Sequence, residues 1–422
     1  MRRYESYKDS GVEWLGDVPA HWEVKKMKFL FTDTSIKNKP NETLLSVTQN
    51  RGVIPRDWLE ERTVMPSGSL ETFKFIEKDD FAISLRSFEG GLEICHHDGI
   101  ISPAYTVLKY NKKLLNNGYY KYLFKCQKFI SEMQTSIVGI REGKNISYEE
   151  LKYSFLPIPQ IIEQQKIAQF LDDKTAKIDQ AVDLAEKQIA LLKEHKQILI
   201  QNAVTRGLNP DVPLKDSGVE WIGQVPEHWD VSSLGKMLLP VSEKNKPNLP
   251  LLSITRELGV IERDIEDQES NHNFIPDDLS NYKVLKKGQF GMNKMKAWQG
   301  SYGVSRFTGI VSPAYYIFDF IKSVNPRFFH WAIRSKIYIS FFGSASDGVR
   351  IGQWDLSKSR MKSIPFIIPS YTEQVQIADY LDQQAVKIDQ AIALKTAHIE
   401  KLKEYKNVLI NDVVTGKVQV SV

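Results

Sequence analysis

The sequence predicts an α/β (α+β) protein with two domains in tandem, each followed by a long α-helix, and with the two helices paired as an antiparallel coiled coil. Three observations predict this fold: an internal repeat, short apolar segments in the first part of each repeat, and a heptad pattern in the last part. The repeat is plainest where residues 8–24 read KDSGVEWLGDVPAHWEV and residues 215–231 read KDSGVEWIGQVPEHWDV, identical at 13 of 17 positions. Such a duplication implies that two related units perform one task twice.

The composition is that of an ordinary globular protein. The 422 residues are 42% hydrophobic, which suffices for each half to bury its own core. The formal net charge is only +4, from 56 basic and 52 acidic residues, so any nucleic-acid surface must be local. No apolar run could span a bilayer, the start does not resemble a signal peptide, and Cys95 and Cys126 make no disulfide framework. We therefore expect a soluble, cytoplasmic protein.

The first part of each half mixes strand and helix signals. Short apolar segments such as residues 44–48 and 104–108 are broken by Gly, Pro and Asn, which is typical of strands and turns. Residues 118–133 carry apolar side chains near helical spacing and predict a helix. We expect the two globular domains to span residues 1–162 and 207–372.

The last part of each half predicts a long helix, at residues 163–206 and 373–416, with a tail at 417–422. Apolar residues follow a heptad from Ala168 to Leu199 and again, 210 residues later, from Ala378 to Leu409. A helix that is apolar along one narrow stripe needs a partner, and the matching lengths and registers favour pairing of the two helices over packing of each on its own domain. The 32 residues from Ala168 to Leu199 would form a rod of roughly 48 Å. Paired antiparallel, the helices would hold the two domains at a set distance.

Motifs for catalysis are missing. An amino-methyltransferase would need the tetrapeptide Asn/Asp-Pro-Pro-aromatic and a glycine-rich cofactor loop. Residues 325–328, NPRF, depart from this tetrapeptide by one residue, and no such loop lies nearby. Residues 139–145, GIREGKN, have the wrong spacing for a phosphate-binding loop. The cluster from Cys95 to Asp98, CHHD, lacks the second ligand pair of a zinc site, and the aligned residues 304–308 hold no ligand. We expect no catalytic residue, no metal site and no cofactor on this chain.

Two basic loops in each half point to binding. Residues 86–91, RSFEGG, align with 296–301, KAWQGS, so each half offers a cation, an aromatic ring, a polar side chain and a small, flexible pair. A second loop appears at 139–145 and at 348–353, GVRIGQ. Each loop alone is more typical of an ordinary turn, but recurrence with differing polar side chains favours two readers of different DNA sequences. The candidate DNA-binding residues are Arg86, Phe88, Glu89, Gly90, Arg141, Lys144, Lys296, Trp298, Gln299, Gly300, Arg350 and Gln353.

Over nearly its whole length the chain resembles the specificity subunits of type I restriction-modification systems. The resemblance is carried by the paired GVEW(L/I)G and VPxHW openings and by SPAY at residues 102–105 and 312–315. It is also carried by the helix starts at 159–168 and 369–378 and by the helix ends, AVTRGL and VVTGK. One departure is that Lys296 and Trp298 stand where the first half has Arg86 and Phe88, so roles of single residues do not transfer between the halves.

The resemblance implies two target recognition domains, each reading one half of a bipartite, asymmetric site in double-stranded DNA. It implies that the helices measure the spacer between the half-sites and help to dock two modification subunits, which carry S-adenosylmethionine and methylate adenine. ATP- and Mg²⁺-dependent restriction subunits would join for cleavage. Two alternatives remain open: a self-contained restriction or methylation enzyme, which would need the missing motifs, and a protein-only coiled-coil scaffold, which would not need the basic loops.

Overall fold

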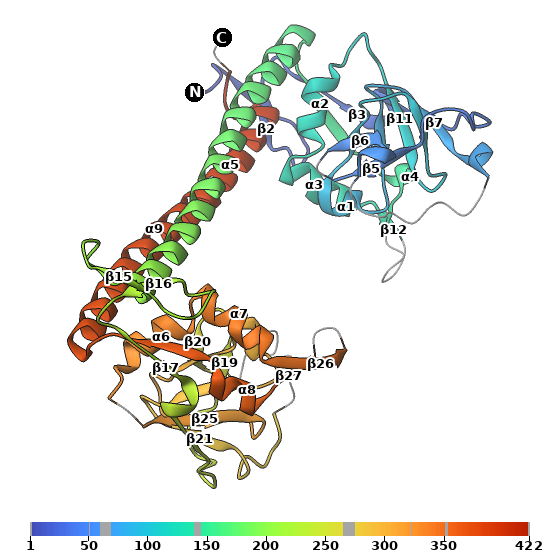
Figure 1. The fold of residues 1–422 in the computed structure, drawn as a ribbon. Coiled ribbons are helices and arrows are strands. Elements are labelled where there is room, and N and C mark those ends of the chain that lie inside the picture. The colour runs from blue at the N-terminus through green and yellow to red at the C-terminus, as the bar shows by residue number, and fades with distance from the viewer. Residues whose placement is uncertain are drawn as a thin grey trace. The chain divides into compact units, whose positions relative to one another are not determined.

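A computed structural model describes residues 2–49, 51–59, 69–138, 145–264, 275–321, 323–350 and 353–420 (Figure 1). The chain forms two compact units. Unit 1 combines Met1–Glu186 with Thr396–Val422, and unit 2 is Lys187–Lys395. Each long helix therefore contributes one part to each unit. The expected limits of the recognition domains, at residues 162, 207 and 372, stay predictions.

The centre of unit 1 is a four-stranded antiparallel sheet of order β4-β11-β8-β9, formed by Phe31–Thr34, Thr106–Tyr110, Phe81–Ile83 and Glu93–Ile94. Two-stranded pairs surround it: β1–β2 (Tyr7–Asp9, Asp17–Pro19), β3–β14 (Glu23–Lys26, Phe155–Ile158), β5–β6 (Leu45–Thr48, Gly52–Pro55), β7–β10 (Lys74–Ile76, Gly99–Ile101) and β12–β13 (Ile137–Val138, Asn145–Ile146). The short helices are α1 (Ser87–Gly90), α2 (Asn117–Leu123), α3 (Gln127–Gln134) and α4 (Tyr148–Leu151).

The single helix expected over residues 118–133 is wrong. The structure has two helices, α2 and α3, because the backbone of Cys126 is extended, with φ −72° and ψ 141°. The break places Lys125 between α2 and α3, from where its side chain reaches back to Glu93 on β9 of the sheet.

The centre of unit 2 repeats that of unit 1. Its four-stranded sheet has the order β18-β25-β22-β23, formed by Leu238–Val241, Tyr315–Phe320, Phe290–Asn293 and Tyr302–Val304. The pairs are β15–β16 (Leu214–Asp216, Gln224–Pro226), β17–β28 (Asp230–Ser233, Pro365–Ile368), β19–β20 (Leu252–Thr255, Gly259–Glu262), β21–β24 (Lys283–Leu285, Gly309–Val311) and β26–β27 (Ser346–Arg350, Gln353–Leu356). The helices are α6 (Pro326–Ile333), α7 (Lys336–Ser344) and α8 (Lys358–Ser363). The repeat in the sequence is thus a repeat in the fold.

Each unit has an aromatic core that also takes in the long helices. In unit 1 the ring of Phe31 lies 5.9 Å from that of Phe81 and 5.5 Å from that of Tyr120, measured between centroids. In unit 2 the ring of Phe290 lies 5.2 Å from that of Phe329. Edge-to-face contacts of this kind stabilise a core beyond the area that they bury.

The two long helices that the sequence predicts are confirmed as α5 (Ile161–Arg206) and α9 (Tyr371–Val414), in green and red in Figure 1. Each begins two residues before its expected start, and α9 ends two residues early. Ser370 and Glu373 form a capping box at the start of α9, since the Glu373 amide donates to Ser370 Oγ at 3.3 Å and the Ser370 amide donates to Glu373 Oε2 at 3.2 Å. Many of the expected heptad positions are buried: Ala168, Leu171, Thr175, Ile178, Ala185, Ala378, Leu381, Ala385, Ile388, Ile399 and Leu409.

Within each unit the parts of α5 and α9 contact each other. In unit 2, Lys395 Nζ donates to Gln188 Oε1 at 2.6 Å, and Lys196 Nζ lies 2.7 Å from Asp389 Oδ2. The residue numbers rise on α5 as they fall on α9, so the two segments run antiparallel within this unit.

Candidate nucleic-acid interface

In unit 1 the first candidate loop is the short helix α1, and it exposes two of its four predicted residues. Arg86 and Glu89 are exposed, whereas the ring of Phe88 is half-buried and packs against the main core of the unit. The start of the helix is held by the Ser84 amide, which donates to Ser87 Oγ at 2.9 Å. The polar side chains of the loop can therefore meet a ligand, while the Phe88 ring packs inward.

The glycines of this loop serve the protein itself. The sequence suggested that they let the backbone approach a ligand, but the carbonyl of Gly90 accepts a hydrogen bond from Lys125 Nζ at 2.8 Å. Gly91 has φ 82°, and a Cβ at this position would clash with the carbonyl oxygen of Phe124. The glycine pair thus allows α1 to sit closely on the end of α2.

The turn between β5 and β6 lies beside α1, a neighbour that the sequence analysis did not predict. Gln49 Nε2 donates to Glu89 Oε2 at 3.5 Å, which links the turn to the candidate loop. Thr48 Oγ1 donates to the carbonyl of Gly52 at 2.8 Å and accepts from the Arg51 amide at 3.1 Å, so one hydroxyl closes the turn. The Arg51 side chain is exposed. The available signal was the spacing of Thr48 and Gly52, which recurs as Thr255 and Gly259.

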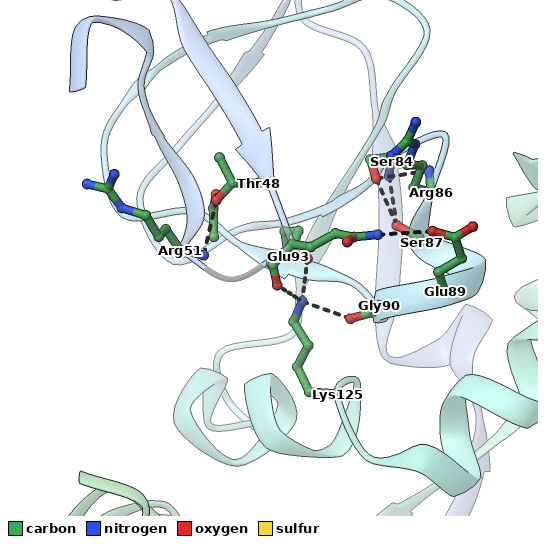
Figure 2. Close-up of polar contacts among 11 residues, drawn as sticks. Thr48, Arg51, Ser84, Arg86, Ser87, Glu89, Gly90, Glu93 and Lys125 are labelled. Atoms are coloured by element: carbon green, nitrogen blue, oxygen red, sulfur yellow. Dashed lines mark hydrogen bonds and ion pairs between the residues drawn. The ribbon is translucent and has the colours of Figure 1, made fainter. Parts of the chain in front are cut away.

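Lys125 joins the turn and the loop. Its Nζ donates to the carbonyls of Gln49, at 2.9 Å, and of Gly90, at 2.8 Å, and it pairs with the carboxylate of Glu93 (Figure 2). Burial raises the pKa of Glu93 to about 7 against the effect of the lysine, and burial lowers the pKa of Lys125. Figure 2 also shows Arg51 and Arg86 extending away from this ammonium group.

In unit 2 the first candidate loop is the 3-10 turn Ala297–Gln299. Lys296 is exposed, Gln299 and Trp298 are half-exposed, and Gly300 has φ 92°. The Trp298 ring packs on that of Trp354, with the centroids 5.0 Å apart. The first loop therefore contacts the hairpin β26–β27, which carries the second.

The second candidate loops are only partly described. Arg350 and Gln353 are paired through their backbones at the end of the β26–β27 hairpin, but their side chains lie outside the described residues. Arg141 and Lys144 lie wholly outside them. In unit 1 the second candidate loop, residues 139–145, follows α3. Gln134 at the end of α3 donates from its Nε2 to the Phe88 carbonyl at 3.1 Å, which links this flank of the loop to α1. Side-chain contacts thus join the first candidate loop to the flank of the second in each unit.

Arg334 is the unit 2 counterpart of Lys125. It directly follows α6, and Lys125 lies two residues beyond the last residue of α2, with Arg334-Ser335-Lys336 aligned on Lys125-Cys126-Gln127. Its Nη2 donates to the carbonyls of Arg256 and Glu257, both at 2.8 Å, in the β19–β20 turn. Its Nη1 donates to the carbonyls of Tyr302, at 2.7 Å, and Gly300, at 3.3 Å. We call Lys125 and Arg334 the bridging cations.

Side chains of the cluster from Cys95 to Asp98 bond to groups of the protein itself. Cys95 Sγ lies 3.1 Å from the carbonyl oxygen of His97, and burial raises the pKa of the thiol to about 12, so it stays protonated. Asp98 Oδ1 accepts a hydrogen bond from the Lys78 amide at 2.7 Å. Among the described residues, no three His, Cys, Asp or Glu side chains are placed to hold a metal ion. Nor does the described part of the chain contain a helix that is long and apolar enough to cross a membrane.

Comparisons with known proteins point to one family. No protein-family model matches the chain. It is 23% identical to the MjaX specificity subunit assigned to a type I restriction enzyme of Methanocaldococcus jannaschii, over 96% of both chains. It is 25% identical to the type I restriction enzyme MjaVIII specificity subunit of the same organism, over 76% of this chain and 75% of that one.

Solved structures share the fold. The HsdS subunit of Thermoanaerobacter tengcongensis matches with a TM-score of 0.54 and 13% identity, over 95% of this chain and 98% of that one. A chain from a structural study of complex assembly and conformational transition in the type I R-M system matches with a TM-score of 0.65 and 13% identity, over 95% and 99%.

Proposed function

We propose that this chain, which its homologues place among the specificity subunits of type I restriction-modification systems, is the non-catalytic subunit that selects the DNA sequence for the complex. Residues 1–162 and 207–372 would be the two target recognition domains. Each reads one half of a bipartite, asymmetric site in double-stranded DNA. Residues 163–206 and 373–416 form the spacer ruler, followed by a tail at 417–422.

The observation that carries this proposal is one loop scaffold, present in both units and equipped with different side chains. In unit 1 the scaffold exposes Arg86 and Glu89, and in unit 2 it offers Lys296 and Gln299. Cationic side chains favour guanine, glutamine favours adenine and glutamate accepts from cytosine, so the two sets suit different bases. A protein-only scaffold would have no need of this difference.

The long helices give the second element of the proposal, the distance between the half-sites. The antiparallel contacts within unit 2 and the buried heptad positions support one continuous coiled coil along α5 and α9. Such a rod would set the spacer, which the protein spans without reading.

The helices also offer duplicated docking surfaces. Leu184 on α5 and its equivalent Leu394 on α9 are both more than half exposed. Ile198 and its equivalent Val408 are also exposed. Exposed apolar residues that recur at equivalent positions suit a partner that binds twice. They support the docking of two modification subunits.

The chemistry of modification and cleavage is assigned to the partners. The modification subunits would bring S-adenosylmethionine for adenine methylation, and the restriction subunits ATP and Mg²⁺ for translocation and cleavage. We place the assembled complex in the cytoplasm, on chromosomal DNA.

Mapping of methylated adenines tests the proposal. Cells that express this chain with its modification subunits should acquire methylation at one bipartite, asymmetric motif, and cells with the modification subunits alone should not. The purified chain with S-adenosylmethionine and DNA should transfer no methyl group. Methylation at an undivided motif, or methyl transfer by the isolated chain, would contradict the proposal.

A further inference from the structure

We infer that the β5–β6 and β19–β20 turns are additional DNA-reading elements, through Arg51 in unit 1 and Arg256 in unit 2, and that Lys125 and Arg334 position each turn against the first candidate loop. The inference rests on the proposed function and extends its reading surface to residues outside the four predicted loops.

The bridging cations occupy equivalent places in the two units. Lys125 and Arg334 are equivalent in sequence, and each joins the same two elements. One is a hairpin turn, and the other is the first candidate loop, which contains Gly90 in unit 1 and Gly300 in unit 2. A partly buried cation is costly unless its donors are satisfied. Each cation therefore holds the turn and the loop in one relative position.

The two cations satisfy their donors differently. Lys125 uses two carbonyls and the Glu93 carboxylate, whereas Arg334 donates four hydrogen bonds to carbonyls only. The residue equivalent to Glu93 in unit 2 is Gly303, which has no carboxylate. The same connection is thus made with different chemistry, which indicates that the geometry of the loops is what the two halves have in common.

The arginines of both turns are exposed. The Arg256 side chain is 68% exposed, and its ion pair with the still more exposed Glu257 is long, at 3.4 Å. Such a surface pair contributes little and is readily exchanged for another partner. Arg51 is exposed, and the hydrogen bond that its Nη1 donates to the Trp58 carbonyl is also long, at 3.4 Å. Both guanidinium groups are available to a base edge or a phosphate.

The exposed side chains of the turn differ between the two copies. Gln49 and Arg51 in the first turn align with Arg256 and Leu258 in the second, while the closing Thr48 and Thr255 are the same. The frame of the turn is retained and its exposed side chains differ, as in the loops at residues 86–91 and 296–301. An arginine pairs with guanine through two hydrogen bonds, so moving it by two positions would change which base is selected.

The test uses the complex of the full chain with its modification subunits and DNA duplexes that carry the mapped site or single-base changes of it. R51A and R256A should each lower the preference for one base pair in their own half-site, by roughly 5- to 150-fold, and leave the other half-site unchanged. K113A and K236A replace exposed lysines outside the turns and should change no base preference.

The bridging cations are tested in the same assay. K125M and R334M should reduce discrimination at several positions of their own half-site only, and K125R and R334K should restore part of it. The midpoint of thermal unfolding of each variant is measured in parallel with the base preference. A lower midpoint with unchanged base preference would overturn the positioning role, and the conservative variants answer the question if the methionine variants do not fold.

The outcomes separate this inference from the proposed function. If the unaltered complex methylates a bipartite site and R51A and R256A read it with unchanged preference, the inference is wrong and the proposed function stands. A uniform loss of affinity for all sequences would assign both arginines to phosphates and would also overturn the reading role. If the unaltered complex selects no site, the proposed function itself fails.

Discussion

Lys406 donates from its Nζ to both carboxylate oxygens of Asp179, at 2.7 Å each, and so ties α9 to α5 within unit 1. The equivalent residues Lys196 and Asp389 make the same contact in unit 2, with the helices exchanged. When two copies of one helix pair antiparallel, each contact occurs twice with the partners reversed. Reciprocal ion pairs are therefore expected when a duplicated helix pairs antiparallel with its own copy.

The apolar positions of the helices, rather than these ion pairs, should supply the stability of the pairing. Leu171 and Leu381 are at most 1% exposed, and L171A or L381A should lower the free energy of unfolding by about 2–5 kcal/mol. K406A should cost only ~0.2–1 kcal/mol, because the pair is exposed to solvent. Urea unfolding of the chain measures both changes. The control L184A alters an exposed leucine and should change stability by less than ~0.5 kcal/mol while weakening the docking of the modification subunit.

The carboxylate of Glu373 should make unit 2 sensitive to acid. Burial alone would raise its pKa, but hydrogen bonds from Ser370, Trp229 and His228 outweigh burial and hold the pKa at about 2, below the ordinary value of 4.5. A group with a lowered pKa stabilises the fold above its unfolded value, and this stabilisation is lost as the pH falls from 4.5 toward 2. E373Q should therefore cost about 1–2 kcal/mol at pH 7 and progressively less below pH 4.5.

Chemical unfolding of E373Q at a series of pH values tests this expectation. E227Q, at an exposed position of the same unit, is the matched control and should be neutral within ~0.5 kcal/mol. A stability difference that stays the same from pH 7 to pH 3 would show that the ionised carboxylate does not act as described.

Removal of the first-loop cations should relax specificity without unfolding the protein. Arg86 and Lys296 are exposed, so R86A and K296A should change stability by less than ~0.5 kcal/mol. Loss of one good base contact should cost roughly 1–3 kcal/mol of discrimination in the half-site of that unit. Binding assays at fixed salt concentration, with duplexes altered in either half-site, measure this. Equal losses for all sequences would mean that the cations contact phosphates.

Lengthening both helices should lengthen the DNA spacer. The end of α5 cannot accept an insertion, because Ile200, Ala203 and Val204 are buried in the core of unit 2. One heptad placed after Glu186 in α5 and another after Lys395 in α9, where the two units meet in the sequence, retains the apolar spacing. The rod grows by about 10.5 Å, which corresponds to roughly three base pairs.

Methylome mapping of this double insertion gives the outcome. The half-sites should be unchanged and the spacer longer, with slower methylation because three base pairs also rotate the DNA by about 100°. The insertion in α5 alone should lose activity, since the two helices no longer match in length. Full activity on the original spacer would show that the helices do not measure the DNA.

The duplication, the two long helices and the absence of catalytic motifs could be predicted from the sequence alone. These features depend on the order of residues along the chain: a repeat is visible as a repeat, and a heptad is visible because helical geometry is periodic. The candidate loops were found in the same way, by comparing residues 86–91 with 296–301. The break between α2 and α3 was not predicted, because the helical spacing of apolar residues continues across Cys126. The helical backbone, however, is interrupted at this residue.

Which segments lie beside those loops depends on contacts between residues that are far apart in the sequence. Lys125 is 76 residues from Gln49 and 35 from Gly90 along the chain, and Arg334 joins Arg256 and Gly300 across similar separations. Both bridging cations bind mainly backbone carbonyls, which every residue carries, so their partners leave no mark in the sequence. The sequence sets which side chains the candidate loops carry. The hydrogen bonds of the folded chain set how the turns and loops are arranged relative to one another.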